Sequence, residues 1–294
     1  MDEKKILILD YNNGYGMLRN DKNVYFSNYY KIYKSNFMNY LRKFVKHFCP
    51  LFLFIFFDNW KKNLNKYDTI VMFDSGYNSN VAKYIKKKNN KCKTIFWYWN
   101  KVNKVNVKNL GSKYIDYYFS YDKNDCKKYV LKYNTQFYNK KLVQGTQNDE
   151  LYDFVYLGSN KGRKEEIINL ENILNDNKYK TNFKIIENKK EFIPYKNYLK
   201  MVSNSKCIVD FVKEGTVGLT LRIFEGMYFQ KKIITNNKTI VNYNFYNSNN
   251  IFVLGIDDIS DISNFMEKKF VEYDKRYLDY YDVVNWVRRF EIDD

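Results

Sequence analysis

Short, continuous apolar runs alternate with helical segments along the chain, and this alternation constrains the fold more than any other feature. The runs are four to seven residues long and cover residues 5–9, 67–73, 93–99, 114–120, 153–157, 183–186, 207–211, 232–235 and 250–254. Helical spacing of apolar residues appears between them, at 80–88, 164–175, 195–203, 220–229 and 259–267. Strands that are apolar on both faces are typical of parallel sheets covered by helices on both sides. The sequence therefore predicts an α/β protein.

The chain is long enough for two domains with separate cores. It has 294 residues, of which 45% are hydrophobic. A polar stretch at 136–150 interrupts the strand pattern, and residues 144–149 have the composition of a linker. We expect a Rossmann-like domain at 1–145, a second at 146–275, and a C-terminal segment at 276–294. A helix at about 279–290 in that segment is a candidate to cross back to the first domain.

Charge and cysteine usage exclude several classes of protein. The net charge of +17 would ordinarily suggest nucleic acid or an anionic membrane as a partner. Lys, Asn, Tyr, Phe and Ile are abundant together, as AT-rich codons produce, so we expect no nucleic-acid partner. The four cysteines are scattered and His47 is the single histidine, which argues against a zinc site and a disulfide scaffold. The first residues do not resemble a secretory signal, so we expect a cytoplasmic protein.

Acidic residues follow three of the predicted strands in the first half. Asp10, Asp74 and Asp122 each come at or just after the end of an apolar run, and Asn13 follows Asp10. Ligands of parallel sheets bind beyond the carboxyl ends of the strands, so these side chains are expected at one edge. Asp74 is the first candidate for a general base because it precedes a glycine turn, with Asp10 and Asp122 behind it. The alternative is that each carboxylate is structural.

A glycine-bearing loop opens a short helix within residues 214–237. Gly215 and Gly218 let the backbone approach a ligand, and Thr220 can cap the helix. Arg222 and Glu225 lie three positions apart on one helical face. The arginine can neutralise a diphosphate, and the glutamate can accept hydrogen bonds from ribose hydroxyls. The alternative is an ordinary loop, helix and strand with a surface ion pair.

Several phrases resemble bacterial capsule and lipopolysaccharide sugar transferases of the GT-B fold. They are DFVYLGSNKGR at 153–163, GLTLRIFE at 218–225 and KIITNN at 232–237, with WYWN at 97–100 and SYDK at 120–123 in the first half. The resemblance implies two Rossmann-like domains facing across a cleft. It also implies a nucleotide-sugar donor held mainly by the second domain and an acceptor held mainly by the first.

The resemblance also implies which residues hold the donor. Metal is usually not needed in this fold, because basic side chains and a helix N-terminus neutralise the diphosphate. The matching positions are Gly158, Ser159, Lys161, Arg163, Gly218, Thr220, Arg222 and Glu225. Retaining enzymes of the fold often carry two glutamates eight positions apart, but the residue eight before Glu225 is Val217. Whether the anomeric centre is retained or inverted is therefore open.

Residues 41–64 form a second notable segment. The apolar run 48–57 is flanked by basic residues, is interrupted by Pro50, and is too short to span a bilayer. It resembles an interfacial patch that docks on the inner face of a membrane. The alternative is a buried strand or helix in the core of the first domain.

Together these features predict a cytoplasmic, metal-independent glycosyltransferase. It would move a sugar from a nucleotide sugar to a saccharide or lipid-linked saccharide during surface polysaccharide assembly. Two alternatives stay open: transfer of a polyol phosphate on a similar frame, and a noncatalytic module that binds a nucleotide or polysaccharide. A nucleic-acid-binding protein would rest on charge alone.

Overall fold

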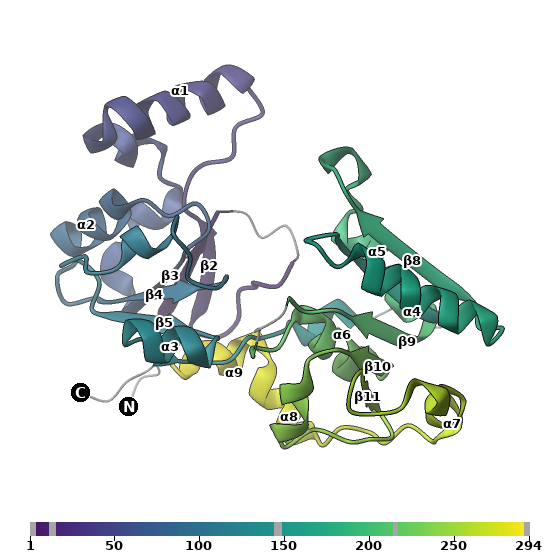
Figure 1. Cartoon of the computed structure of the whole chain (residues 1–294). Coiled ribbons are helices and arrows are strands. Elements are labelled where there is room, and N and C mark those ends of the chain that lie inside the picture. Colours follow the sequence, from purple (N-terminus) through teal and green to yellow (C-terminus); the bar gives the residue numbers. More distant parts are fainter. Residues whose placement is uncertain (1–3, 12–15, 144–148, 214–216, 291–294) are drawn as a thin grey trace. The chain divides into compact units, whose positions relative to one another are not determined.

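The computed structural model describes residues 4–11, 16–143, 149–213 and 217–290 (Figure 1). The chain divides into two compact units. The first unit contains residues 1–135 and 286–294, and the second contains residues 136–285. The sequence placed these divisions at residues 145 and 275. The expected linker residues 144–148 lie outside the described part of the chain.

The first unit is built on a six-stranded parallel sheet with strand order β2-β1-β3-β4-β5-β6. Its strands are β1 (Ile6–Asp10), β2 (Val24–Asn28), β3 (Thr69–Phe73), β4 (Lys93–Tyr98), β5 (Tyr117–Ser120) and β6 (Lys132–Tyr133). Its α-helices are α1 (Asn36–Phe48), α2 (Ser79–Lys88) and α3 (Lys123–Tyr129). The 3-10 helices η1 (Pro50–Phe56), η2 (Asn59–Lys62) and η3 (Leu64–Lys66) follow α1, and η4 (Val107–Asn109) follows β4.

The second unit is built on a five-stranded parallel sheet with strand order β11-β10-β9-β7-β8. Its strands are β7 (Tyr152–Ser159), β8 (Thr181–Ile186), β9 (Ser205–Asp210), β10 (Lys232–Thr235) and β11 (Ile251–Val253). Its α-helices are α4 (Lys164–Asp176), α5 (Tyr195–Ser203), α6 (Leu221–Phe229), α7 (Ile262–Glu267) and α8 (Lys275–Tyr281). Short 3-10 helices are η5 (Lys140–Val143), η6 (Lys189–Glu191), η7 (Lys238–Asn242) and η8 (Ile259–Asp261).

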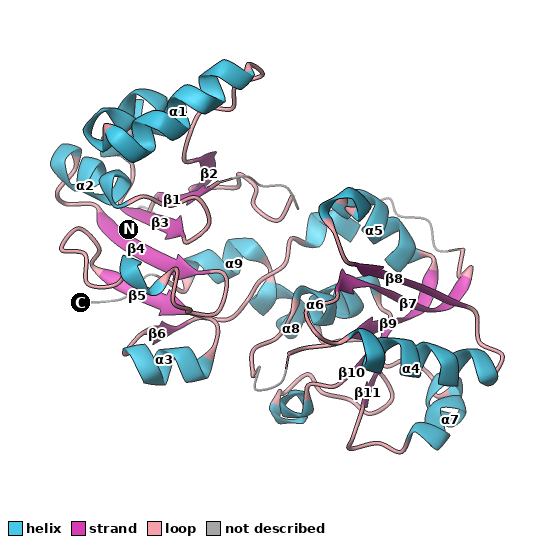
Figure 2. Ribbon diagram, turned by 45° about the horizontal axis from the view of Figure 1, so that its top comes forward, coloured by secondary structure: helices cyan, strands magenta, loops and turns pink. Residues whose placement is uncertain are grey.

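Helices cover both faces of the second sheet. Figure 2 shows α5 and α6 on one side of its strands and α4 and α7 on the other. Ile167, Leu170 and Leu174 of α4 share a buried cluster with alternate residues of β7 and β9, such as Phe154 and Cys207. The continuous apolar runs are explained by this arrangement, since central strands such as β9 and β10 bury both of their faces. The predicted α/β class and parallel sheets are therefore confirmed.

The predicted C-terminal helix is wrong in one respect. The structure has two short helices, α8 and α9 (Val283–Arg288), instead of one helix at 279–290. Asp282 separates them because its backbone is extended, with φ −66° and ψ 138°. The peptide N–H of Val283 donates to Tyr138 O at 2.8 Å, which directs the chain away from the axis of α8. From Trp286 onward the chain belongs to the first unit.

Residues 41–64 contain exposed and buried parts, and membrane docking stays a prediction. No residue of α1 is buried, so a core position for this helix is wrong. The core instead receives Leu53 and Phe56 from η1, Trp60 from η2 and Leu64 from η3. Within the described residues, no helix is long and apolar enough to cross a membrane.

Candidate functional site

Two of the three acidic candidates in the first unit follow neighbouring strands. Asp10 is the last residue of β1, and Asp74 directly follows β3, which pairs with β1. Asp74 Oδ1 accepts from Trp99 N at 3.2 Å, and Asp74 Oδ2 accepts from Asn106 Nδ2 at 3.4 Å. Burial raises the pKa of the Asp74 carboxyl. A carboxylate with a raised pKa at the carboxyl edge of a parallel sheet is suited to proton transfer.

Asp122 has a structural role. Its side chain is fully buried and caps α3, because Oδ1 accepts from Asn124 N at 2.9 Å and from Asp125 N at 3.1 Å. Its second oxygen lies 3.4 Å from Lys101 Nζ. These contacts are those of an N-cap, so the geometry offers no separate reason to make Asp122 catalytic. Asn13 lies outside the described residues.

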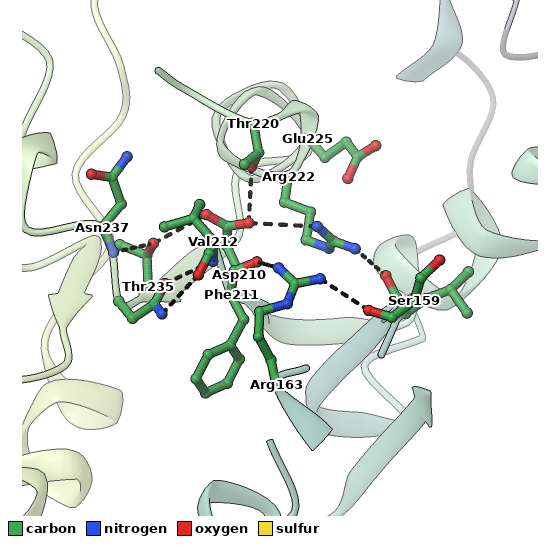
Figure 3. Close-up of polar contacts among 12 residues, drawn as sticks. Ser159, Arg163, Asp210, Phe211, Val212, Thr220, Arg222, Glu225, Thr235 and Asn237 are labelled. Atoms are coloured by element: carbon green, nitrogen blue, oxygen red, sulfur yellow. Dashed lines mark hydrogen bonds and ion pairs between the residues drawn. The ribbon is translucent and has the colours of Figure 1, made fainter. Parts of the chain in front are cut away.

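Asp210 is the centre of a polar network in the second unit, shown in Figure 3. This fully buried residue ends β9. Its carboxylate accepts from Thr220 Oγ1 at 2.9 Å and from Thr235 Oγ1 at 3.0 Å, and lies 3.5 Å from Arg222 Nη1. One side chain thereby joins the end of β9, the end of β10 and the start of α6.

Thr220 occupies the N-cap position of α6, but its side chain does not cap the helix. The predicted cap is therefore wrong. The hydroxyl donates to the Asp210 carboxylate instead, and a hydrogen bond to an ionised acceptor is stronger than one between neutral groups. The first peptide N–H groups of α6 receive no side-chain cap.

Arg222 is anchored to the sheet on two sides. Its Nη1 pairs with Asp210, and its Nη2 donates to Leu157 O on β7. The guanidinium carbon lies 5.3 Å from the centre of the Tyr156 ring. Buried Arg222 Nε and Tyr156 Oη have no hydrogen-bond partner among the described residues.

Gly158 has a packing reason that the sequence did not reveal. A Cβ at this position would lie 2.5 Å from Tyr156 Oη and 2.6 Å from Arg222 Nη2. Only glycine therefore lets these two side chains approach the end of β7. The prediction that Gly158 and Ser159 let a phosphate approach is a separate statement, and it stays a prediction.

Arg163 ties two strand ends together. Its guanidinium donates to Ser159 O at 2.9 Å, to Asn160 O at 3.4 Å and to Phe211 O. The loop after β7 is thereby connected to the residue after β9. In the same loop, exposed Lys161 has a left-handed backbone with φ +46°. Of these two basic residues, Lys161 presents the side chain with greater exposure.

Glu225 lies inside the second unit. It is 1% exposed, and its two oxygens accept from Tyr195 Oη at 2.7 Å and from Tyr198 Oη at 2.6 Å. Burial raises the pKa of this carboxyl. The structure thus gives Glu225 a role in joining α6 to α5, and ribose binding stays a prediction.

The glycine loop before α6 is only partly described. Gly215, with Glu214 beside it, lies outside the described residues. Gly218 is buried, and its carbonyl accepts from Asn237 Nδ2 at 3.3 Å. The described part of the loop is therefore held against the residue that follows β10.

A cavity of about 1110 Å³ lies at the carboxyl ends of β9 and β10, beside α4. Among the residues that the structure describes, four basic side chains line it: Lys161, Arg163, Lys213 and Lys238. Glu166 is the single acidic residue among the described lining residues. Apolar side chains, among them Phe211, Leu254 and Ile259, form part of the wall. A ligand with an anionic part and a flat or apolar part fits this combination.

Sequence reasoning missed Asp210, Tyr156, Lys213 and Lys238. A signal for Asp210 was present, because it follows the apolar run Cys207–Val209 in the same way that Asp74 follows β3. Nothing in the local sequence indicates that Lys238 and Arg163 line the same cavity. Lys238 follows β10 and Arg163 follows β7, and these strands share a sheet in which β9 lies between them. In the described part of the chain, no three His, Cys, Asp or Glu side chains are grouped to hold a metal. Metal independence stays a prediction.

Comparisons with known proteins bear on the fold. No protein-family model matches the chain, and no curated protein matches its sequence. Among solved structures, it is similar to an alpha-glucosyltransferase in complex with UDP and a 13-mer DNA containing a HMU base. The TM-score is 0.55, with 12% identity over 80% of this chain and 83% of that chain. The two chains share a fold. At this identity the similarity supports the glycosyltransferase fold that the sequence predicted, without the capsule or lipopolysaccharide type.

Proposed function

We propose that the chain is a cytoplasmic glycosyltransferase. It takes a sugar from a nucleotide-sugar donor held by the second unit and transfers it to a saccharide or lipid-linked saccharide in surface polysaccharide assembly. The basic cavity at the carboxyl ends of β9 and β10 carries this proposal. In a parallel sheet this edge is where nucleotides bind. The fold shared with an alpha-glucosyltransferase adds support.

Cations in the cavity would do the work of a metal ion. Sugar transfer requires the departing diphosphate to be neutralised as the glycosidic bond breaks. Lys161 and Lys213 are exposed residues on the lining of the cavity, and Arg163 also lines it. Arg222 of α6 lies outside this lining and binds Leu157 O on β7. Each guanidinium has five N–H donors, so an arginine that already binds carbonyl oxygens keeps donors for a phosphate.

Uridine is the first base to test, because the similar alpha-glucosyltransferase was solved with UDP. For an inverting reaction, Asp74 is the proposed base for the acceptor hydroxyl. Burial raises the pKa of this carboxyl toward neutral pH, where a general base is most effective. The stereochemical outcome stays open.

Binding of UDP tests the donor site. We expect UDP to raise the thermal midpoint, as any ligand of the folded state does. The double variant Lys161→Ala/Lys213→Ala should weaken UDP binding about tenfold, which is ~1.4 kcal/mol. Lys196→Ala/Lys200→Ala is the matched control, because these exposed lysines of α5 do not line the cavity. Equal binding by both double variants would contradict the proposed site.

Slow release of free sugar from UDP-sugars separates an enzyme from a noncatalytic module. UDP binding without any sugar release would favour the module. Release of a polyol phosphate from a nucleotide-activated polyol, with no sugar release, would favour the polyol-phosphate transferase.

A nucleic-acid acceptor is the second candidate. The complex of the similar alpha-glucosyltransferase contains DNA, and this chain has a net charge of +17. Labelled sugar from a UDP-sugar should then appear on hydroxymethylated DNA, and DNA binding should weaken steeply with salt. Label on a lipid-linked saccharide, and none on DNA, supports the first candidate.

A further inference from the structure

The first unit presents an apolar surface built from α1 and η1, which we call the docking surface. No residue of α1 is buried. The exposed apolar side chains that define the surface are Phe44, Phe48, Leu51, Phe52, Phe54 and Ile55. Phe48 is 69% exposed and Leu51 is 70% exposed. Large apolar groups rarely gather in the open unless another surface covers them.

The apolar side chains are held outward by an anchored segment. Leu53 and Phe56 of η1 are buried, so the same helix has one face in the core and one face exposed. Lys61 Nζ donates to Phe54 O at 2.8 Å and to Ile55 O at 3.1 Å, which satisfies carbonyls at the end of η1. The Phe54 ring is stacked on Tyr84 of α2. The exposure of the apolar side chains of η1 is therefore a property of the fold.

The charge around the docking surface has one sign. No Asp or Glu occurs between Lys22 and Phe57, a stretch that includes Arg42, Lys43 and Lys46. The helix α2, which packs against η1, also contains no acidic residue. Apolar side chains surrounded by cations complement a surface that is apolar inside and anionic outside.

A small cavity joins the apolar and cationic parts. It has a volume of about 390 Å³ and lies between η1 and α2. Leu51 and Phe54 line it from η1, and Lys83, Lys87 and Lys88 line it from α2. An anionic head group could therefore meet three ammonium groups beside two apolar side chains.

We propose that the docking surface binds an anionic lipid bilayer, with α1 in the plane of the interface. A helix of 13 residues is about 20 Å long, which is shorter than the ~30 Å hydrocarbon core. Its exposed phenylalanines enter the boundary between head groups and acyl chains, and the lysines contact lipid phosphates. The bilayer is favoured over a protein partner because all charged residues of α1 and α2 are basic.

Vesicle flotation tests the proposal. The probes are vesicles of phosphatidylcholine alone and of phosphatidylcholine with phosphatidylglycerol. We expect the full chain to float with the anionic vesicles at low salt, and to float at least tenfold less with neutral vesicles or in high salt. Failure of the full chain to float with anionic vesicles at low salt would overturn the proposal.

Two pairs of variants locate the contact. Phe48→Ser/Leu51→Ser should lower anionic vesicle binding at least tenfold. Phe192→Ser/Ile256→Ser, at exposed positions of the second unit, should leave it unchanged. Lys87→Glu/Lys88→Glu on α2 should also lower binding at least tenfold. Lys127→Glu/Lys128→Glu is the matched control for this variant, because these two lysines are in the last turn of α3 as Lys87 and Lys88 are in the last turn of α2. Equal losses from variant and control would overturn the proposal.

Two further measurements distinguish bilayer binding from self-association and from nucleotide binding. If a second copy covers the surface, sedimentation of the free protein would show a dimer, and Phe48→Ser/Leu51→Ser would make it monomeric. Such a dimer without vesicle binding would overturn the proposal. The UDP-induced thermal shift should be unchanged in the three variants of the first unit, because the proposed donor cavity lies in the second unit. Vesicle binding and nucleotide binding can therefore fail independently.

Discussion

Asp210 illustrates how a single residue organises the polar network at the carboxyl end of β9. Its carboxylate receives hydrogen bonds from Thr220 and Thr235 and pairs with Arg222, so it fixes residues on three elements. It is fully buried, and removing it would leave the Arg222 guanidinium without its carboxylate partner. A partly buried cation that loses its partner costs several kcal/mol.

We expect Asp210→Ala to lower the free energy of unfolding by about 3–5 kcal/mol. The matched control is Glu187→Ala, which breaks a half-exposed pair with Lys164 and should cost under about 1 kcal/mol. Thermal unfolding with and without UDP measures both changes. Similar midpoints for the two variants would show that the Asp210 network does not stabilise the second unit.

Gly158→Ala should destabilise the protein by about 1–3 kcal/mol, because the new methyl group meets Tyr156 Oη and Arg222 Nη2. Tyr156→Phe removes the nearest of these atoms, so the double variant should recover part of the loss. Tyr156→Phe alone should be close to neutral, since its hydroxyl has no hydrogen-bond partner among the described residues. A strictly additive double variant, measured by thermal unfolding, would refute this packing account.

The buried carboxyl of Glu225 is expected to make the stability of the protein depend on pH. Burial raises the pKa of its carboxyl above the ordinary value of 4.5, so the folded state holds the proton more tightly than the unfolded state. Its contribution to stability is therefore full below that ordinary value and is lost as pH rises through the raised pKa. Glu225→Gln should flatten this part of the profile. Subtracting the two thermal-midpoint profiles removes the other carboxyl groups, and a flat difference would contradict the prediction.

At the scale of elements, the apolar pattern predicted the central strands of the sheets better than the edge strands. Most strands found in advance have a buried apolar run, and β8 was found from its apolar sequence although none of its residues is fully buried. The edge strand β2 was missed because only Val24 of its five residues is fully buried, so it carries no apolar run. The helix α1 was missed because none of its residues is fully buried, and its second half was taken as part of a patch beginning at residue 41.

The contact between α6 and β10 depends on Gly226. A Cβ there would overlap Ile233 Cγ1 and Cδ1. Gly226→Ala should therefore destabilise by about 1–3 kcal/mol, although alanine favours a helix by ~1 kcal/mol over glycine. In the background Ile233→Ala the overlap is absent, and Gly226→Ala should become neutral or stabilising. Denaturation of the four proteins measures this coupling, and an equal cost in both backgrounds would disprove it.

On the scale of the whole molecule, the chain returns to the first unit after completing the second. Trp286 is fully buried in the first unit, with its ring 5.3 Å from Trp97 and 6.0 Å from Phe73. Its Nε1 donates to Thr135 O at 2.6 Å. Trp286 therefore helps to complete the core of the first unit.

Trp286→Ala should cost about 3–5 kcal/mol through the cavity and the lost contacts. Because the donor cavity belongs to the second unit, UDP binding at low temperature should persist. Ile32→Ala, at a residue that is 75% exposed, is the control and should change stability by less than about 0.5 kcal/mol. Calorimetry with and without UDP measures stability and binding. Loss of UDP affinity in Trp286→Ala would contradict the expectation that nucleotide binding does not depend on Trp286.

The sequence by itself determined the α/β class, the parallel strands and the edge of each sheet where polar residues gather. Local patterns suffice for these features, because a strand buried on both faces must be apolar throughout and must end where polar residues begin. Only the tertiary structure decided which partner each polar group takes. Glu225 binds Tyr195, Asp210 binds Thr235, and Trp286 binds Thr135, and each pair is distant in sequence. Hydrogen-bond partners follow from the packing of whole elements, which no local pattern encodes.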